Sequence, residues 1–198
     1  MKIIVSRFNE CVEWTKKLEN VTIYNKGSRL SGFLNSKTME NVGREGHTYY
    51  SYIYNNYDSL DDFTVFLQGF PFDHSPNVIR DVLSFSKSLD FLPLGRIFST
   101  FRDHCYHHDG LPSLNVYNYL FDDNFNSGEI EFTPGAQFIV SKRFILSRPR
   151  SFYLKIVNLL NNSINPIEGY VIERFHRIIF DSEYKNNLEQ KVKIIENM

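Results

Sequence analysis

The sequence predicts a single α/β domain over residues 1–198, with a mixed, mainly parallel central sheet flanked by helices. Short apolar runs alternate with longer segments whose apolar residues recur at helical spacing, which is typical of strand–helix–strand units. The apolar runs are nearly continuous, as in strands that are buried on both faces. A chain of 198 residues is also long enough to bury the core that such a sheet requires.

The first half of the chain supplies the clearest elements. Three apolar runs predict buried strands, at residues 2–6, 21–25 and 63–68, and Gly27 ends the second of them. Between these strands we expect a short helix over residues 12–18 and a helix rich in tyrosine over residues 46–57. Ser75 followed by Pro76 predicts another helix, with the serine as its cap and the proline at the first helical position.

The second half is less regular at first. Residues 91–128 are interrupted by prolines and glycines, and a long segment without clear periodicity is often a functional loop region. Residues 135–141 then predict a strand, and residues 151–161 and 166–180 predict helices. The charged tail from residue 183 predicts a solvated helix.

Charge and composition narrow the partners and the compartment. The net charge of −1 gives no global attraction to nucleic acid or to an anionic membrane, so we expect no nucleic-acid partner. No apolar stretch approaches the roughly 18 residues of a membrane span. The apolar run after Met1 is too short for a signal peptide, and two cysteines, Cys11 and Cys105, are too few for a disulfide framework. We therefore expect a soluble protein, cytoplasmic or otherwise intracellular.

Common catalytic motifs are missing, which weakens several enzyme classes. The chain has no Gly-rich dinucleotide turn, no Walker loop, no Gly-x-Ser-x-Gly elbow and no Cys-x-x-Cys pair. A loop containing His104, His107, His108 and Asp109 has the residue types of a metal site, but its spacing fits no standard zinc signature. We interpret that loop as a polar segment lining a cleft.

Polar residues gather where the predicted strands end. Asp73 and His74 follow the strand at residues 63–68, and the carboxyl ends of parallel strands are where open α/β sheets bind ligands. A carboxylate suits a divalent cation that binds a diphosphate, and Mn²⁺ also accepts imidazole. The alternative is that Asp73 or Ser75 caps the following helix. Lys26, at the end of another strand, either approaches a phosphate or is solvated.

Glu173 lies on the predicted helix 166–180 and has three interpretations. With Arg177 it forms an i, i+4 pair that favours a surface ion pair. With His176 it matches half of a di-iron carboxylate motif, whose second half is absent. A carboxylate flanked by basic groups is also suited to act as a general base.

Several ordered blocks of the chain resemble known domains. They lie at residues 4–14, 23–27, 41–49, 65–69, 135–140 and 173–180, and so cover most of the chain outside residues 91–128. Together they resemble a family of largely uncharacterised fungal, bacterial and viral domains, and a glycosyltransferase domain of large DNA viruses. The resemblance implies a GT-A-like (Rossmann-like) fold. It also implies transfer of a sugar from a nucleotide diphosphate sugar, with a UDP-sugar as the leading donor, to a glycan or other hydroxyl acceptor.

The same resemblance assigns site residues. Glu173 takes the place of the general base. Asp73 and His74 stand where GT-A enzymes usually carry an Asp-x-Asp motif, which this chain lacks, and would hold Mn²⁺ or Mg²⁺. The expected contacts to the nucleotide sugar are Ser6, Arg7, Asn9, Glu10, Lys26, Asn41, Arg44 and Gln68. The alternatives are a non-catalytic glycan- or nucleotide-binding module with this fold, and a metal-dependent hydrolase built on the loop at residues 104–109.

Overall fold

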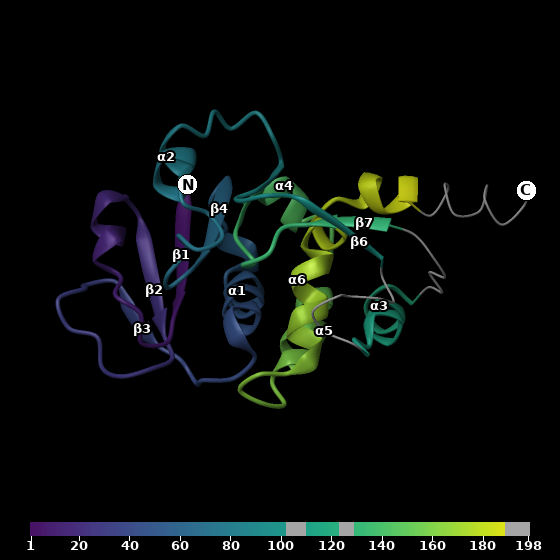
Figure 1. The fold of residues 1–198 in the computed structure, drawn as a ribbon, viewed down its shortest axis with the longest axis horizontal. Helices are drawn as coiled ribbons and strands as arrows, with labels where there is room; N and C mark the ends of the chain where they lie inside the picture. The colour runs from purple at the N-terminus through teal and green to yellow at the C-terminus, as the bar shows by residue number, and fades with distance from the viewer. Residues whose placement is uncertain (102–109, 123–128, 189–198) are drawn as a thin grey trace, which may run out of the picture.

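A six-stranded sheet forms the centre of the computed structural model, which describes residues 1–101, 110–122 and 129–188 (Figure 1). The strand order is β3-β2-β1-β4-β8-β5. The neighbours from β3 to β4 pair in parallel, whereas β8 is antiparallel to both β4 and β5. The mainly parallel sheet is therefore confirmed. Its strands are β1 Lys2–Arg7, β2 Val21–Asn25, β3 Ser36–Thr38, β4 Phe63–Gln68, β5 Phe91–Pro93 and β8 Phe138–Ser141.

Alternate residues of the inner strands feed two separate cores. Ile3 and Val5 point into one hydrophobic cluster, and Ile4 between them points into the other. β4 divides in the same way, with Val65 to one side and Phe66 to the other. Successive strand residues face opposite sides of a sheet, so a continuous apolar run is what two buried faces require.

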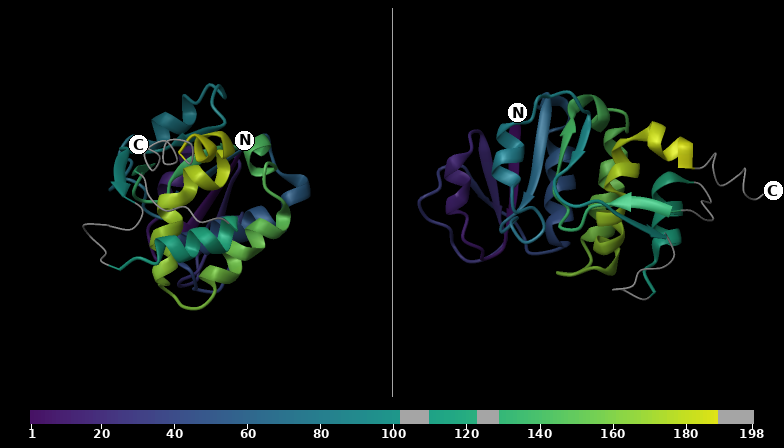
Figure 2. Two further views of the ribbon diagram at one scale, coloured as in Figure 1. Left: turned by 90° about the vertical axis from the view of Figure 1, so that its right-hand side faces the viewer. Right: turned by 45° about the horizontal axis from the view of Figure 1, so that its top comes forward.

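The helices cover both faces of the sheet (Figure 2). One core is shared with α1 Arg44–Asn55, α5 Arg150–Leu160 and α6 Ile167–Phe180. The other is shared with the short 3-10 helix η1 Glu13–Lys17 and with α2 Val78–Leu83. These elements confirm the helices expected at residues 12–18, 46–57, 151–161 and 166–180, within a few residues. Of the described helices, none is long and apolar enough to cross a membrane.

The segment expected to be an irregular loop contains regular structure. Besides β5, it holds β6 Phe98–Phe101 and α3 Ser113–Phe121, and β6 pairs antiparallel with β7 Glu129–Phe132 as a separate two-stranded ribbon. α3 packs against α5 and α6. Strands of three or four residues are too short to produce a clear hydrophobic period, which explains why the sequence pattern missed them. A further short helix, α4 Lys142–Ile145, follows β8.

The start of α2 also differs from the expectation. The helix begins at Val78, its N-cap residue is Asn77, and no side chain forms a capping hydrogen bond there. The Ser75 hydroxyl instead donates to the carbonyl oxygen of Leu94. The capping interpretation of Asp73 and Ser75 is therefore wrong.

The order of the strands creates a crevice at the carboxyl ends of β1 and β4. From β1 the chain moves outward to β2 and β3, and then returns through α1 to β4 on the other side of β1. β1 and β4 run parallel, with Ser6 opposite Gln68 at their carboxyl ends. The connections leave these two strands in opposite directions, which is the arrangement that opens a ligand crevice in α/β sheets.

Candidate functional site

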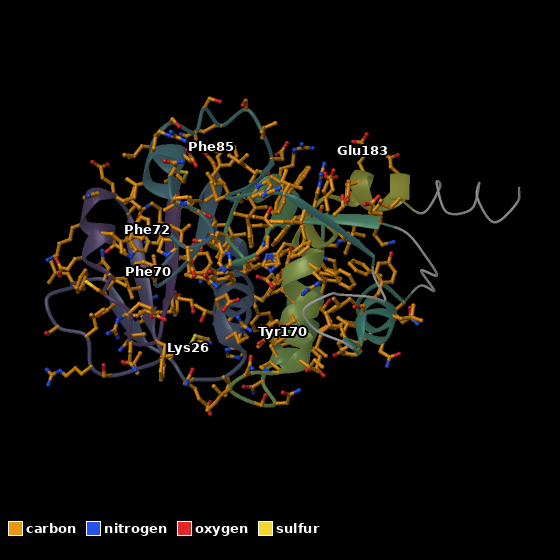
Figure 3. All side chains as sticks on the ribbon, in the orientation of Figure 1. Lys26, Phe70, Phe72, Phe85, Tyr170 and Glu183 are labelled. Carbon is orange, nitrogen blue, oxygen red and sulfur yellow. The ribbon has the colours of Figure 1, made fainter. Side chains whose placement is uncertain are left out.

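A cleft of about 560 Å³ opens at this crevice. Its walls come from the loops after β1, β2 and β4, the start of α1, and the loop between α5 and α6. Lys26 and Phe70, two of its lining residues, are labelled in Figure 3. Most of the residues proposed from sequence line the cleft, namely Ser6, Arg7, Glu10, Lys26, Asn41, Arg44, Gln68 and Asp73. Asn9, His74 and Glu173 are not part of this lining.

Arg7 and Asn9 build the rim of the cleft. The buried Arg7 guanidinium donates to the Asn25 side chain and to the backbone carbonyls of Phe8, Glu10 and Ser28. The Asn9 side-chain oxygen accepts hydrogen bonds of 2.9 and 2.8 Å from the backbone and hydroxyl of Ser28. Both side chains fix the loop after β1 against the loop after β2.

Lys26 holds the start of α1 in place. Its buried ammonium donates to the carbonyl oxygens of Val42 and Arg44. Burial lowers the pKa of Lys26 to about 8, although Glu45 opposes the effect. The lysine is thus not solvated, and two of its three N–H donors go to carbonyl groups. Its contact to a phosphate in the cleft stays a prediction.

Arg44 is the cation best placed to meet a ligand in the cleft. Its guanidinium lies over the Tyr170 ring, 4.4 Å from the centroid, and 3.4 Å from the Asn165 side-chain oxygen. Burial disfavours its charge, but Glu45, Tyr170 and Glu173 outweigh this and raise the pKa of Arg44. Its own backbone has φ of 52°, a conformation that is uncommon outside glycine and that clusters at functional sites.

Glu10 and Gly69 close the floor between β1 and β4. The Glu10 carboxylate accepts a 2.7 Å hydrogen bond from the backbone of Phe8. A Cβ atom at Gly69 would lie only 2.4 Å from that carboxylate, so a larger residue there would displace the Glu10 side chain. The carboxylate is thereby held against the end of β4.

Two phenylalanines on the cleft wall were missed in the sequence. Phe8 and Phe70 each lie two residues beyond the paired Ser6 and Gln68, and their side chains are 48% and 51% exposed. Exposed rings in the wall of a cleft offer a surface on which a planar ligand can stack. The signal was an aromatic residue at the same offset after two neighbouring strands. Ile164 and Asn165 also line the cleft, and nothing in the local sequence points to them.

Asp73 and His74 are neighbours in sequence but line different hollows. Asp73 lines the cleft and accepts a 2.9 Å hydrogen bond from the His74 backbone. His74 lines a different hollow beside Gly95, and its ring packs against Gly135. Within the described ranges, no group of three or more His, Cys, Asp or Glu side chains is placed to hold a metal ion. The loop at residues 104–109 lies outside the described residues.

Asp73 nevertheless fits one way of holding a divalent cation. Mg²⁺ is commonly bound by one or two carboxylates together with phosphate oxygens of the substrate and water. Asp73 offers one such carboxylate in the cleft, with its second oxygen 3.9 Å from the His74 ring. The residues present therefore suit a cation that arrives with a diphosphate.

Glu173 is not in the cleft lining and instead lines a smaller hollow beside α6. Its carboxylate accepts a 2.6 Å hydrogen bond from the backbone of Gly135. Burial, and next the negative charge of Glu45, raise the pKa of Glu173, while Arg174 and Arg44 partly offset them. The ion-pair interpretation is wrong, because among the described residues Arg177 pairs with Glu131 and Asp181. The carboxylate that remains is partly buried, interacts with the charges of Glu45 and Arg44, and has a raised pKa.

Comparison with known proteins gives one match. A family model described as "Protein of unknown function (DUF3431)" matches residues 3–91 and 99–194. No curated protein and no solved structure matches the chain.

Proposed function

We propose that this chain, which belongs to the DUF3431 family, transfers a sugar from a nucleotide diphosphate sugar to a glycan or other hydroxyl acceptor. One observation carries the proposal. Exposed rings, a stacked arginine and a carboxylate meet in a single cleft at the carboxyl ends of β1 and β4. This is the position at which α/β sheets bind nucleotides, and the sequence resemblance to GT-A glycosyltransferases leads to the same function.

Each part of a nucleotide sugar has a matching group in the cleft. A base can stack on Phe8 or Phe70, since stacking needs only an exposed ring. Arg44 offers a planar, permanently charged fork to the diphosphate. Asp73 would hold Mn²⁺ or Mg²⁺, which would neutralise charge on the diphosphate as it leaves.

Glu173 supplies the remaining step. The acceptor oxygen attacks the anomeric carbon of the sugar, the bond from that carbon to the diphosphate breaks, and the hydroxyl proton passes to Glu173. A carboxylate with a raised pKa is a stronger base than an exposed one, and Glu173 has that property because it is buried near Glu45. Arg44, close to both carboxylates, keeps a positive charge beside the departing diphosphate.

The rival function is a binding module that does not catalyse transfer. The two basic side chains other than Arg44 in the cleft, Arg7 and Lys26, donate to backbone carbonyls and hold loops together. A cleft built in this way can bind a nucleotide without turning it over. Hydrolysis of UDP-sugars in the presence of Mn²⁺ separates the two functions, because a binding module leaves the donor intact.

Calorimetric titration tests nucleotide binding directly. We expect UDP or GDP to bind, and to bind more tightly with Mn²⁺ than without it. Arg44→Gln should weaken binding by roughly tenfold, since it removes a charge-assisted contact to phosphate. Arg80→Gln, on exposed α2, is the matched control and should change nothing. The proposed function fails if neither nucleotide binds under any metal condition.

A further inference from the structure

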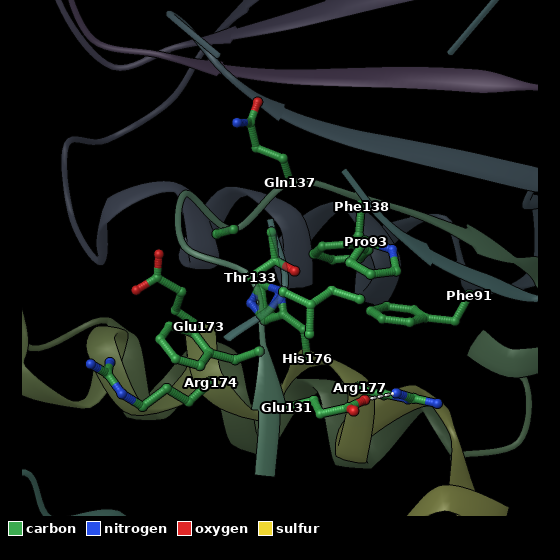
Figure 4. A pocket seen from close by; sticks show the side chains of 13 residues that line it. Phe91, Pro93, Glu131, Thr133, Gln137, Phe138, Glu173, Arg174, His176 and Arg177 are labelled. Atoms are coloured by element: carbon green, nitrogen blue, oxygen red, sulfur yellow. Dashed lines mark hydrogen bonds and ion pairs between the residues drawn. The ribbon is translucent and has the colours of Figure 1, made fainter. Parts of the chain in front are cut away.

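A second hollow lies between α6, the β6–β7 ribbon and the edge of the main sheet (Figure 4). It is much smaller than the cleft, about 30 Å³ against about 560 Å³, and shares no lining residue with it. We call it the ring pocket, after the three phenylalanines in its wall. Its apolar lining residues are Phe91, Pro93, Ile97, Phe132, Ala136 and Phe138.

Thr133, Gln137 and His176 in this wall each carry a buried polar atom without a partner among the described residues. That of Gln137, its side-chain oxygen, is turned away from the hollow (Figure 4). Thr133 and His176 are only 8% and 5% exposed. The Thr133 hydroxyl and the Nε2 atom of His176 have no hydrogen-bond partner among the residues that the structure describes. Folded proteins pair nearly all such atoms with protein, water or ligand, so two of them on one small hollow need an explanation.

The other polar side chains of the wall are already engaged or turned away. The Gln137 amide points toward the loop after β4, where it donates to the Pro71 carbonyl at 3.0 Å and to Ser75. Glu131 pairs with Arg177, and the Glu173 carboxylate is turned to Gly135. The unmet hydrogen-bonding capacity of the ring pocket is therefore that of Thr133 and His176.

The chemistry of these two atoms defines the missing group. Burial lowers the pKa of His176 to about 3, so its imidazole is neutral at ordinary pH, with one nitrogen that donates and one that accepts. A threonine hydroxyl both donates and accepts. A single hydroxyl group can satisfy both, because it donates one hydrogen bond and accepts another. A charged group would lose its hydration against the surrounding rings.

We infer that the ring pocket binds the hydroxyl-bearing end of a neutral carbon ring, such as an aromatic or cyclic alcohol. The hydroxyl lies between Thr133 and His176, and the ring, which is larger than the hollow, lies across its open side beside Phe91 and Phe132. Glu173, the base of the proposed transfer, also lines this pocket, but its carboxylate is turned to Gly135, so occupancy of the pocket does not require a nucleotide in the cleft.

Phenol and toluene make a matched pair of probes, because they differ only in a hydroxyl and a methyl group. Binding is measured by ligand-observed NMR with wild-type protein, with Thr133→Val and with Thr64→Val. The last variant makes the same change at another buried threonine, on β4 and outside the ring pocket. We expect Thr133→Val to weaken phenol binding by about tenfold, the loss of one hydrogen bond, and to leave toluene unchanged. Thr64→Val should bind phenol as the wild type does.

Three results would overturn the inference. They are equal phenol affinity in Thr133→Val and wild type, displacement of phenol by UDP, and a phenol-soaked crystal that shows only ordered water between Thr133 and His176. If Thr133→Val does not fold, His176→Phe applies the same test from α6, and the soaked wild-type crystal decides in either case. Failure of nucleotide binding leaves all three results readable, so the two proposals can fail separately.

Discussion

The cleft and the ring pocket are both lined in part by residues near or on α6, but they differ in size, polarity and hydrogen bonding. The cleft is wide and mostly polar, and its charged groups are held by backbone carbonyls, by a tyrosine ring and by one another. The ring pocket is small and has phenylalanines in its wall, and the buried polar atoms of Thr133 and His176 that face it have no partners among the described residues. α6 contributes to both, because Tyr170 supports Arg44 in the cleft while His176 lines the pocket. The charged groups of the cleft already have protein partners, which fits binding of a charged ligand. The two buried atoms of the pocket have none in the described part of the chain, which fits binding of a neutral ligand that supplies the missing hydrogen bonds.

The largest expected effect is a loss of unfolding free energy at low pH. One buried histidine in each region contributes to it. Burial lowers the pKa of His47, near Lys26, to about 4, and that of His176 to about 3, from 6.5. As the pH falls below 6.5, the unfolded chain takes up protons that the folded chain does not. Stability is therefore full above that pH and is lost below it, by about 1.4 kcal/mol per pH unit for each histidine.

Urea titrations between about pH 6 and about pH 4.5 measure this slope. His176→Phe and His47→Phe should each remove about one histidine's share of the slope. An unchanged slope in either variant would mean that this histidine is protonated in the folded protein. The pKa values of His47 and His176 would then differ by more than the burial of their imidazole rings accounts for.

Glu173→Gln should lower the rate of sugar transfer by roughly 10²-fold or more and leave nucleotide affinity nearly intact. The amide keeps the size of the side chain but cannot take the acceptor proton. Glu131→Gln is the matched control, because Glu131 lines the ring pocket as Glu173 does but pairs with Arg177. Glu173 instead interacts with the charges of Glu45 and Arg44 of the cleft. The rate of the control variant should stay within about twofold of wild type. Equal rates for Glu173→Gln and wild type with a true acceptor would remove Glu173 from the mechanism.

Phe70→Ala should weaken UDP binding by about tenfold, the scale of one stacked base. Phe98→Ala provides the comparison, since Phe98 is similarly exposed, at 41%, but lies on β6 outside the cleft. Calorimetry of both variants is decisive. Equal affinities for the two variants would show that the exposed ring of the cleft is not a stacking surface.

Asp73→Asn should give the smallest effect. Its side chain is 57% exposed, so the lost charge should weaken Mn²⁺-assisted UDP binding by about fivefold and leave metal-free binding alone. The amide oxygen can still accept from the His74 backbone, so the loop after β4 should keep its shape. Titration of UDP with and without Mn²⁺ measures both the metal-assisted and the metal-free affinity. Identical metal dependence in mutant and wild type would show that Asp73 only holds the loop after β4 and binds no metal.

The parts of the fold that could be predicted are those that carry strong apolar patterns. β1, β2 and β4 are buried on both faces, so Ile3, Ile4 and Val5 form an unbroken run that leaves little choice. β5, β6 and β7 were missed because three or four residues are too few to show a period, and their pairing partners are distant in sequence.

The candidate site divides in a similar way. Strand ends such as Gln68 and Asp73 could be located, because polar groups at the end of a buried run point to the crevice. The hydrogen-bond partner of each side chain could not be predicted. Lys26 turned out to bind carbonyls of residues 42 and 44, and Glu173 to bind the backbone of Gly135. Those contacts depend on how loops far apart in the chain meet in three dimensions.

The backbone of Gly43 donates a 2.8 Å hydrogen bond to Ser163, and that of Arg44 donates to Ile164. These bonds attach the start of α1 to the loop between α5 and α6, so segments from the first and second halves of the chain close the cleft together. A fragment that stops before Ile164 would lack one wall, and a fragment that lacks β1 would lack another. Occupancy of the cleft should therefore report on the integrity of the whole chain, and a bound nucleotide should raise the temperature at which all of it unfolds.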